Sequence, residues 1–338
     1  MAGTMKDKIL LAHGSGGSLS REMIRECFLG PLNNPLLDAL EDAAVFNANG
    51  RLAFTTDSYV VNPLFFPGGD IGKLSVCGTV NDLSMMGAAP VYLSLSLIIE
   101  EGFDIEQIHL IVASIRSTAA EAGVEIVTGD TKVVERRKAD RLFINTAGIG
   151  RIAHGVKISS RHARIGDKII LSGTIGDHGI AVLGHREGFA FETRIESDCA
   201  PLNGLVAQML KESEEIRSMR DPTRGGLAAV LNEIAEQSKV GMKIEEQSLP
   251  VCSAVRTACD FLGMDPLHLA NEGKLVAVVS GGDAEKLVSK MRHHKYGRNA
   301  AVIGKIVADH PGSVVMKTCI GSHRIIPWPS GELLPRIC

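Results

Sequence analysis

The last residue of the chain, Cys338, carries the side chain with the clearest chemical potential. A terminal cysteine presents a nucleophilic thiol on the part of a chain that moves most easily. Three prolines and Gly331 precede it, so stiff stretches are joined by a pivot, as is typical of an arm. The positive charge of Arg336 offsets the negative charge of the terminal carboxylate, which would otherwise raise the pKa of the Cys338 thiol. The pattern predicts a tethered sulfur outside the folded cores, and the alternative is a chance cysteine on a disordered tail.

Four aspartates in the first half of the chain indicate a cation site. They fall at strand ends, in a helix or beside a glycine, and they are Asp42, Asp57, Asp82 and Asp130. One such residue alone is usually a turn or cap residue. Four converging carboxylates repel one another unless a divalent cation lies among them. Oxygen ligands without Cys or His pairs favour Mg²⁺, and glycine loops ahead of helices favour a nucleoside triphosphate such as ATP.

Other polar residues are candidates for the same site. Asn81 precedes Asp82 within an apolar helix pattern, where short polar residues lower helix propensity. A glycine turn at Gly129 leads to an aspartate and then to Lys132, with the last two on one side of an extended segment. Lys132 either supplies a cation to the site or only pairs with the aspartate. His178 follows a second glycine loop and is placed outside the catalytic set, because a histidine there is more often structural.

Apolar periodicity predicts the elements that position these residues. Helices are expected at 70–86 and 105–122, and strands at 51–57, 91–99 and 141–150. A second strand–helix set begins at residue 167, so the fold class is mixed α/β (α+β) in two domains. The divisions are a 1–39 segment with a glycine loop, domains at 40–152 and 153–318, and a mobile tail at 319–338.

Composition narrows the class of protein. The chain has 338 residues, a formal net charge of −3 and 45% hydrophobic residues, which argues against nucleic acid as the main partner. No apolar run has transmembrane length, and the first residues do not resemble a signal peptide. Seven cysteines show no metal-ligand spacing, so reduced thiols and a cytoplasmic location are expected.

Seven motifs resemble a known family in their order along the chain. They are Glu-Asp-Ala-Ala-Val at 41–45, Thr-Thr-Asp at 55–57, Val-Asn-Asp-Leu at 80–83, Gly-Asp-Thr-Lys-Val-Val at 129–134, Asp-Pro-Thr-Arg-Gly-Gly at 221–226, Asn-Glu-Gly at 271–273 and the terminal Pro-Arg-Ile-Cys. The order is similar to that of the HypE family of hydrogenase-maturation proteins. That family belongs to a superfamily with aminoimidazole ribonucleotide synthetase (PurM), selenophosphate synthetase and thiamine-monophosphate kinase. Glu41 stands where the kinases carry an aspartate, so its part in a metal site stays open.

The resemblance implies a two-domain PurM-like fold whose first domain forms a dimeric, β-barrel-like sheet. It implies an ATP-dependent dehydration of a carbamoyl group on Cys338 to a thiocyanate, which supplies cyanide ligands to the iron of NiFe hydrogenase. The implied partners are the carbamoyltransferase HypF and the HypC–HypD complex. By position, Asp221 would join the four aspartates around Mg²⁺–ATP, Lys132 would stabilise charge on the oxygen that reacts, and Glu272 would remove amide protons.

Two other functions fit the same residues. A small-molecule kinase or synthetase of the same superfamily, with an inert tail, would keep its turnover after loss of Cys338. A non-catalytic carrier of a metal group on Cys338 would hydrolyse no ATP.

Overall fold

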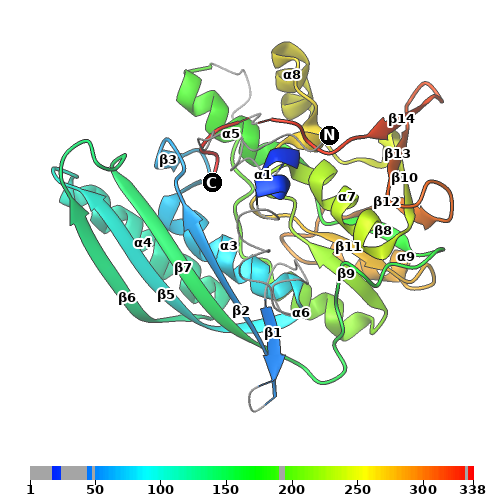
Figure 1. The fold of residues 1–338 in the computed structure, drawn as a ribbon, viewed down its shortest axis with the longest axis horizontal. Helices are drawn as coiled ribbons and strands as arrows, with labels where there is room; N and C mark the ends of the chain where they lie inside the picture. Colours follow the sequence, from blue (N-terminus) through cyan, green and yellow to red (C-terminus); the bar gives the residue numbers. More distant parts are fainter. Residues whose placement is uncertain (1–16, 24–43, 48–49, 190–194, 332–333) are drawn as a thin grey trace.

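Two α/β domains follow one another along the chain (Figure 1). The computed structural model describes residues 17–23, 44–47, 50–189, 195–331 and 334–338. Most of the glycine loop at 13–18, together with Glu41 and Asp42, lies outside these residues. Among the described residues, no helix is long and apolar enough to cross a membrane.

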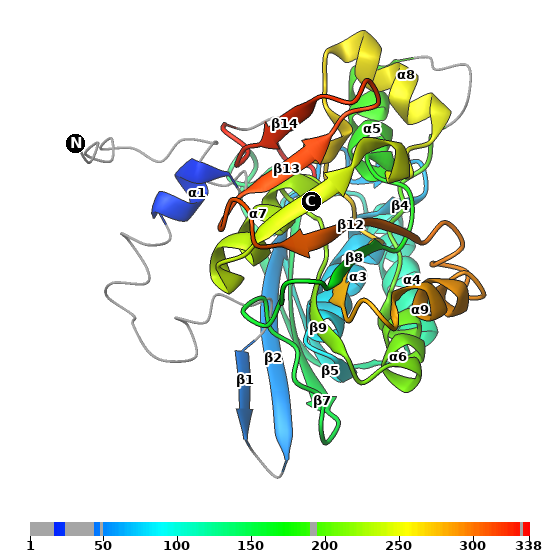
Figure 2. The same ribbon diagram turned by 90° about the vertical axis from the view of Figure 1, so that its right-hand side faces the viewer.

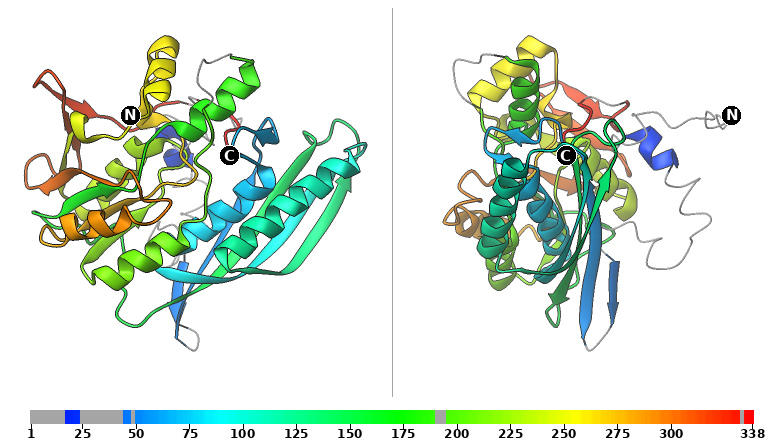
Figure 3. Two further views of the ribbon diagram at one scale, coloured as in Figure 1. Left: turned by 180° about the vertical axis from the view of Figure 1, so that it is seen from behind. Right: turned by 90° about the vertical axis from the view of Figure 1, so that its left-hand side faces the viewer.

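The first domain contains a five-stranded sheet in the order β1-β2-β7-β5-β6. Only β5 and β6 are parallel. The strands are β1 (Ala44–Asn47), β2 (Arg51–Tyr59), β5 (Ala88–Glu100), β6 (Glu125–Val134) and β7 (Leu142–Ile152). Helices α3 (Ile71–Met85) and α4 (Ile105–Ala122) lie behind the sheet in Figure 1 and in front of it in Figure 3, left.

Helix α3 is the central element of the molecule. Asp70 caps its first turn by accepting hydrogen bonds from the backbone N–H groups of Gly72 and Lys73. Thirteen of its fifteen residues are buried, because the helix lies between the first sheet and α6 and β9 of the second domain. Asn81 and Asp82 near its end therefore lie close to the boundary between the domains.

The two faces of the first sheet differ. Along β2, Ala53, Thr55 and Tyr59 are buried against the helices, whereas Phe54 points the other way and is 41% exposed. Strand register aligns Phe54 with Ile149 and Tyr92 on neighbouring strands, and both of these are also exposed. No described element covers this face, which we call the open face.

The second domain contains a seven-stranded sheet in the order β14-β13-β10-β12-β8-β11-β9 (Figure 2). Its strands are β8 (Lys168–Leu171), β9 (Ile216–Arg220), β10 (Gly241–Glu245), β11 (Val276–Val279), β12 (Ala301–Val307), β13 (Val314–Lys317) and β14 (His323–Ile326). Its helices are α5 (Asp177–Glu187), α6 (Asn203–Glu212), α7 (Gly226–Ser238), α8 (Ser253–Leu262) and α9 (Ala284–Met291). All four residues of β11 are buried: Val276 and Val278 enter one core, and Ala277 and Val279 enter the core on the other face.

Five short elements complete the described secondary structure of the chain. They are α1 (Ser18–Met23), the paired strands β3 (Phe65–Phe66) and β4 (Gly69–Asp70), and the 3-10 helices η3 (Glu246–Ser248) and η4 (Pro266–His268). The strand β14 lies within the segment expected as tail, so the second sheet extends beyond residue 318.

The predicted helices at 70–86 and 105–122 are confirmed, as are the strands at 51–57, 91–99 and 141–150. The predicted turn at Gly129 is wrong, because β6 runs unbroken from Glu125 to Val134. A Cβ atom at Gly129 would lie 2.3 Å from the carbonyl oxygen of Leu95 on β5. The glycine is thus needed for close approach of two paired strands.

The end of the tail packs onto the first domain. The N–H of Val60 donates to the terminal carboxylate of Cys338 (3.2 Å), and the N–H of Asn62 donates to the carbonyl of Arg336 (3.1 Å). Ile337 is only 4% exposed and joins the first domain's core, with Cys338 packed against the same core. The prediction that the tail ends outside both cores is therefore wrong for this docked position, because Ile337 gains more from burial than a polar end would.

Candidate active site

The docked tail places Cys338 between the two domains. Figure 1 shows the C-terminus between β3 of the first domain and α5 of the second. From α5, Arg186 donates to the carbonyl of Pro335 (2.6 Å), and Nε2 of His178 lies 2.8 Å from the carbonyl oxygen of Ile337. On the other side, Arg336 donates to the carbonyl of Val60 (2.9 Å) and forms an ion pair with Asp140. Backbone and side-chain contacts from both domains thus fix the position of the sulfur.

Charged groups surround this sulfur. Burial raises the pKa of the Cys338 thiol to about 12, the Arg224 guanidinium opposes that rise, and Glu272, Asp57 and Asp221 add to it. The docked thiol is therefore protonated at neutral pH and is a poor nucleophile in this position. A sulfur that already carries an acyl group needs no thiolate. The docked position consequently suits a reaction on a group attached to the sulfur better than attack by the sulfur itself.

Glu272 is the buried acid of this cluster. Its residue is 3% exposed, and its Oε1 atom has no hydrogen-bond partner among the described residues. Burial, followed by the neighbouring Cys199 and Asp221, raises its pKa well above the usual value. A buried carboxyl oxygen without a partner is costly, so it indicates a group kept ready for a proton or a ligand.

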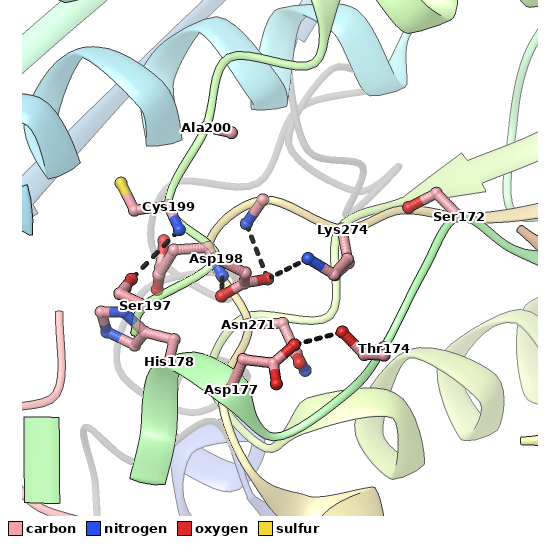
Figure 4. A network of polar contacts seen from close by, with 12 residues as sticks. Ser172, Thr174, Asp177, His178, Ser197, Asp198, Cys199, Ala200, Asn271 and Lys274 are labelled. Atoms are coloured by element: carbon pink, nitrogen blue, oxygen red, sulfur yellow. Dashed lines mark hydrogen bonds and ion pairs between the residues drawn. The ribbon is translucent and has the colours of Figure 1, made fainter. Parts of the chain in front are cut away.

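A polar network around Asp198, shown in Figure 4, fixes the backbone that carries Glu272. The carboxylate of Asp198 accepts from the N–H groups of Glu272 and Gly273, both at 3.1 Å, and pairs with Lys274 at 3.3 Å. A Cβ atom at Gly273 would lie 1.8 Å from the Asp198 carbonyl oxygen, so only glycine fits there.

Asn81 completes the support from the first domain. Its Nδ2 donates to the carbonyls of Ala200 (3.1 Å) and Glu272 (3.3 Å), and its Oδ1 accepts from the N–H of Leu202 (2.8 Å). These backbone partners occupy the side-chain amide. Asn81 therefore joins α3 to the second domain and positions Glu272.

Three of the predicted metal ligands lie on the helix-covered side of the first sheet or next to it. Asp57 is 3.9 Å from Arg224 and accepts from the N–H of Ser58, and Asp82 accepts from the hydroxyl of Thr55 (2.8 Å). Asp221 is buried, and this burial raises its pKa to about 6. Raised pKa values suit carboxylates whose charge is to be balanced by a cation.

Asp130 and Lys132 lie elsewhere. The β6 register pairs Asp130 with Ser96 and Lys132 with Ile98, which puts both side chains on the open face. They form an ion pair at 2.8 Å, and both are more than half exposed. Strands β7 and β5 separate them from β2, a distance of about 14 Å at the usual strand spacing. Neither residue contributes to the surroundings of Cys338 within one protomer.

The described residues fit a Mg²⁺ site only in part. The charges of Asp57 and Asp221 act on Cys338, and those of Asp57 and Asp82 act on Tyr59, so these three carboxylates share one neighbourhood. Asp130 lies on the opposite face of the sheet. Within the described ranges, no three His, Cys, Asp or Glu side chains form a group that could hold a metal ion. The five-aspartate set is therefore not assembled by the described part of a single protomer.

Sequence reasoning missed several residues of this site. Arg224 lies inside the Asp-Pro-Thr-Arg-Gly-Gly motif, so a signal for it was available. Asp198 stands in no motif, and only the structure connects it with Glu272. Tyr59 is fully buried, and a Cβ at Gly78 would lie 2.2 Å from its hydroxyl, so that glycine in α3 makes room for the ring.

Comparison with known proteins agrees with this architecture. The N-terminal domain of AIR synthase related proteins matches residues 40–152, and the C-terminal domain matches residues 164–317. The carbamoyl dehydratase HypE of Azotobacter vinelandii is 52% identical over 329 residues, which is 97% of this chain and 96% of that protein.

Two solved structures are similar over most of the chain. HypE in a HypE–HypF complex has a TM-score of 0.87 and 51% identity, over 91% of this chain and 99% of that one. HypE in complex with ATP has a TM-score of 0.83 and 48% identity, over 98% of this chain and 100% of that one. The expected two-domain PurM-like fold is confirmed. The chain belongs to the HypE family of carbamoyl dehydratases, enzymes of hydrogenase maturation.

Proposed function

We propose that this chain uses ATP to dehydrate an S-carbamoyl group on its own Cys338 to a thiocyanate, for the cyanide ligands of NiFe hydrogenase. The observation that carries the proposal is the position of the sulfur, which is docked beside a guanidinium, Arg224, and a buried acid, Glu272. An ATP complex of a 48% identical HypE supports ATP as the second substrate.

The chemistry needs activation of a poor leaving group. Transfer of the γ-phosphoryl group from ATP to the carbamoyl oxygen releases ADP, and one amide proton leaves as the C=N bond forms. Breaking the C–O bond then releases phosphate, the second proton leaves the nitrogen, and the C≡N bond of the thiocyanate is complete. The carboxylate of Glu272 would accept a proton, and its raised pKa makes that carboxylate a stronger base than an exposed glutamate.

Mg²⁺–ATP would be held by Asp57, Asp82 and Asp221, with Asp42 and Asp130 as further ligands. Bound Mg²⁺ supplies positive charge to the phosphate oxygens. The oxygen ligands near the sulfur and the raised pKa values of Asp57 and Asp221 support this assignment. Gly129 would lie beside the nucleotide, next to Asp130 on β6, and Asn81 would contribute by positioning Glu272.

A homodimer through the open face would complete the site. This face carries exposed apolar side chains: Phe54, Ile149 and Tyr92 are aligned across three strands, and Ile98 lies further along β5 beside Lys132. Lys132 and Asp130 lie on the same face, so a second copy packed there would bring them toward a neighbouring Cys338. Lys132 of the second copy would then stabilise charge on the reacting oxygen.

Two kinds of partner follow from the proposed reaction. A carbamoyltransferase of the HypF type must load the sulfur, and the solved HypE–HypF complex supports that choice. An iron-carrying HypC–HypD complex would accept the cyanide group. The described cysteines are all free thiols, which fits a cytoplasmic, reducing location.

Intact mass analysis of the C-terminal peptide tests the reaction. The parent protein, incubated with a carbamoyl donor, its transferase and Mg²⁺–ATP, should first gain a carbamoyl group on Cys338. The peptide should then lose the mass of one water as ADP appears. A non-hydrolysable ATP analogue is the control and should stop the peptide at the carbamoyl stage. ADP formation without any mass change at Cys338 would favour a small-molecule kinase.

A further inference from the structure

The imidazole of His178 contacts the tail at the carbonyl group of Ile337, whose carbon is bonded directly to Cys338. The ring is fully buried on α5, with Nε2 2.8 Å from the carbonyl oxygen of Ile337 and Nδ1 2.8 Å from the hydroxyl oxygen of Ser197. The ring of Phe66 packs against it edge-on, with centroids 5.4 Å apart. This is a buried polar contact, whereas the tail contacts made by Arg186 and Arg336 are only part-buried.

The partners of the ring determine where its proton lies. A carbonyl oxygen only accepts, so Nε2 must carry the hydrogen that faces Ile337. In the neutral ring Nδ1 is then an acceptor, and the hydroxyl of Ser197 donates to it. Burial lowers the pKa of His178, which keeps the ring neutral. The opposite tautomer would set the Nε2 lone pair against the Ile337 carbonyl.

Ser197 has two further hydrogen bonds that fix its position. Its hydroxyl oxygen accepts from the N–H of Cys199 at 3.1 Å (Figure 4), which leaves the hydroxyl hydrogen to point at His178. Its own N–H donates to the carbonyl of Pro67 at 2.8 Å. Pro67 belongs to the first domain, so the hydroxyl that fixes the tautomer is tied to both domains.

We propose that His178, kept in its Nε2–H tautomer by Ser197, is the positioning residue that docks the C-terminal tail and directs the sulfur into the site. The carbonyl that it holds belongs to the peptide bond between Ile337 and Cys338, so this contact sets the direction in which the cysteine leaves the core. The role rests on the proposed function, because it presents the acylated sulfur for dehydration. His178 touches no reacting atom.

Alkylation of Cys338 measures docking without ATP or a carbamoyl donor. The full-length protein is treated with iodoacetamide, and each cysteine is followed by peptide mass. Ser197→Ala removes the donor to Nδ1, and His178→Leu removes the whole contact. Loss of one buried hydrogen bond should raise the alkylation rate of Cys338 about tenfold in both variants. His178→Gln, whose side-chain amide can still donate to the Ile337 carbonyl, should stay close to the parent.

Two controls separate undocking from unfolding. His185→Gln changes an exposed histidine of the same helix and should leave the rate unchanged. Cys77 and Cys259 are buried in the cores and should stay protected in every variant. If these two cysteines are labelled together with Cys338 in His178→Leu, that variant has unfolded globally. The comparison then rests on Ser197→Ala, which keeps the imidazole. If Cys338 is alkylated at the parental rate in a folded Ser197→Ala protein, the proposal is wrong.

A second arm measures the reaction itself. With carbamoylated Cys338, Ser197→Ala should lower kcat for thiocyanate formation about tenfold while KM for ATP stays the same. Suppose that Cys338 is alkylated faster in Ser197→Ala than in the parent, but the parent itself does not dehydrate its carbamoyl group. That result would disprove the proposed function and would still support the docking role of His178. If Ser197→Ala is alkylated at the parental rate and the parent dehydrates its carbamoyl group normally, only the docking role is disproved.

Discussion

Asp57 and Asp130 lie on opposite faces of one sheet, with two strands between them. Asp57 points to the helix-covered face beside Arg224, and Asp130 points to the open face beside Lys132. A sheet alternates its side chains, so no small movement of either strand brings the two carboxylates together. A site that uses both residues must therefore draw on two copies of the chain.

Subunit mixing tests this consequence. Lys132→Ala and Cys338→Ala should each be inactive as separate dimers. A 1:1 mixture, unfolded and refolded together, should recover about a quarter of the parental rate, because half of the dimers are mixed and each holds one complete site. Thiocyanate formation at the Cys338 peptide is the measurement. No recovery in mixtures that contain mixed dimers would mean that Lys132 acts within its own chain or not at all.

Cys338→Ala should abolish thiocyanate formation and leave ATP binding unchanged. The sulfur is only partly buried against the first core, whereas Ile337 is buried in it, so loss of the sulfur should change the melting temperature little. Calorimetry with Mg²⁺–ATP and a thermal melt check both points. Ile337→Ala is the comparison variant, and it should weaken docking by about 2 kcal/mol. Dehydration of a free carbamoyl compound by the alanine variant would contradict the tethered reaction.

The sequence predicted the positions of α3 and α4, and the motifs pointed to Cys338, Glu272 and Asp57. Two features could not be predicted in this way. The face on which Asp130 points depends on an irregularity in the β5–β6 register between Leu93 and Ser94, and no local pattern reveals it. The role of Asp198 depends on a loop 74 residues away in the chain, which only the tertiary fold brings near.

The terminal residues show the same limit. The prolines and glycine before Cys338 predicted an arm but gave no information about what the arm contacts. Ile337 finds its pocket because Val60 and Asn62 leave backbone N–H groups for the tail to pair with. An apolar residue next to a terminal cysteine was the available signal, and one apolar residue is too weak to predict docking.

Asp82→Asn should weaken Mg²⁺-dependent ATP binding about tenfold or more. The asparagine oxygen can still accept from the hydroxyl of Thr55, so the change removes one ligand charge and little else. Calorimetry at fixed Mg²⁺ gives the affinity, and stability without nucleotide should be unaltered. Glu285→Gln, an exposed carboxylate of α9, is the matched control and should bind as the parent does. Unchanged affinity in Asp82→Asn would remove this residue from the site.

Docking of the tail should weaken above about pH 9. The thiol pKa rises from 9.0 when free to about 12 when docked, so the docked state favours the protonated form. This contribution is fully present below pH 9 and is lost as the pH rises toward 12, because the undocked thiol ionises first. Between pH 8 and pH 10 the undocked fraction should grow about tenfold.

Trypsin cleavage after Arg336 reports this undocking. The cleavage rate of the parent should rise about tenfold more over that range than the rate of Cys338→Ser, whose hydroxyl does not ionise. Cleavage of an unrelated peptide corrects for the pH dependence of the protease. Equal slopes in the two proteins would mean that the sulfur is not desolvated in the docked tail.

Lys132 and Glu272 should fail at different steps. If Lys132 stabilises charge on the oxygen that receives the phosphoryl group, Lys132→Ala should leave carbamoylated Cys338 with no ADP formed. Glu272→Gln keeps the size of the buried side chain and removes its basic oxygen, so activation can proceed while elimination is slow. ADP should then appear without thiocyanate, because the activated intermediate is hydrolysed back to the carbamoyl form. ADP and the Cys338 peptide mass are measured in the same samples. If Glu272→Gln forms thiocyanate at the parental rate, the Oε1 atom of Glu272, which has no hydrogen-bond partner among the described residues, is not the base. The Asp198 network would then hold this loop for packing alone.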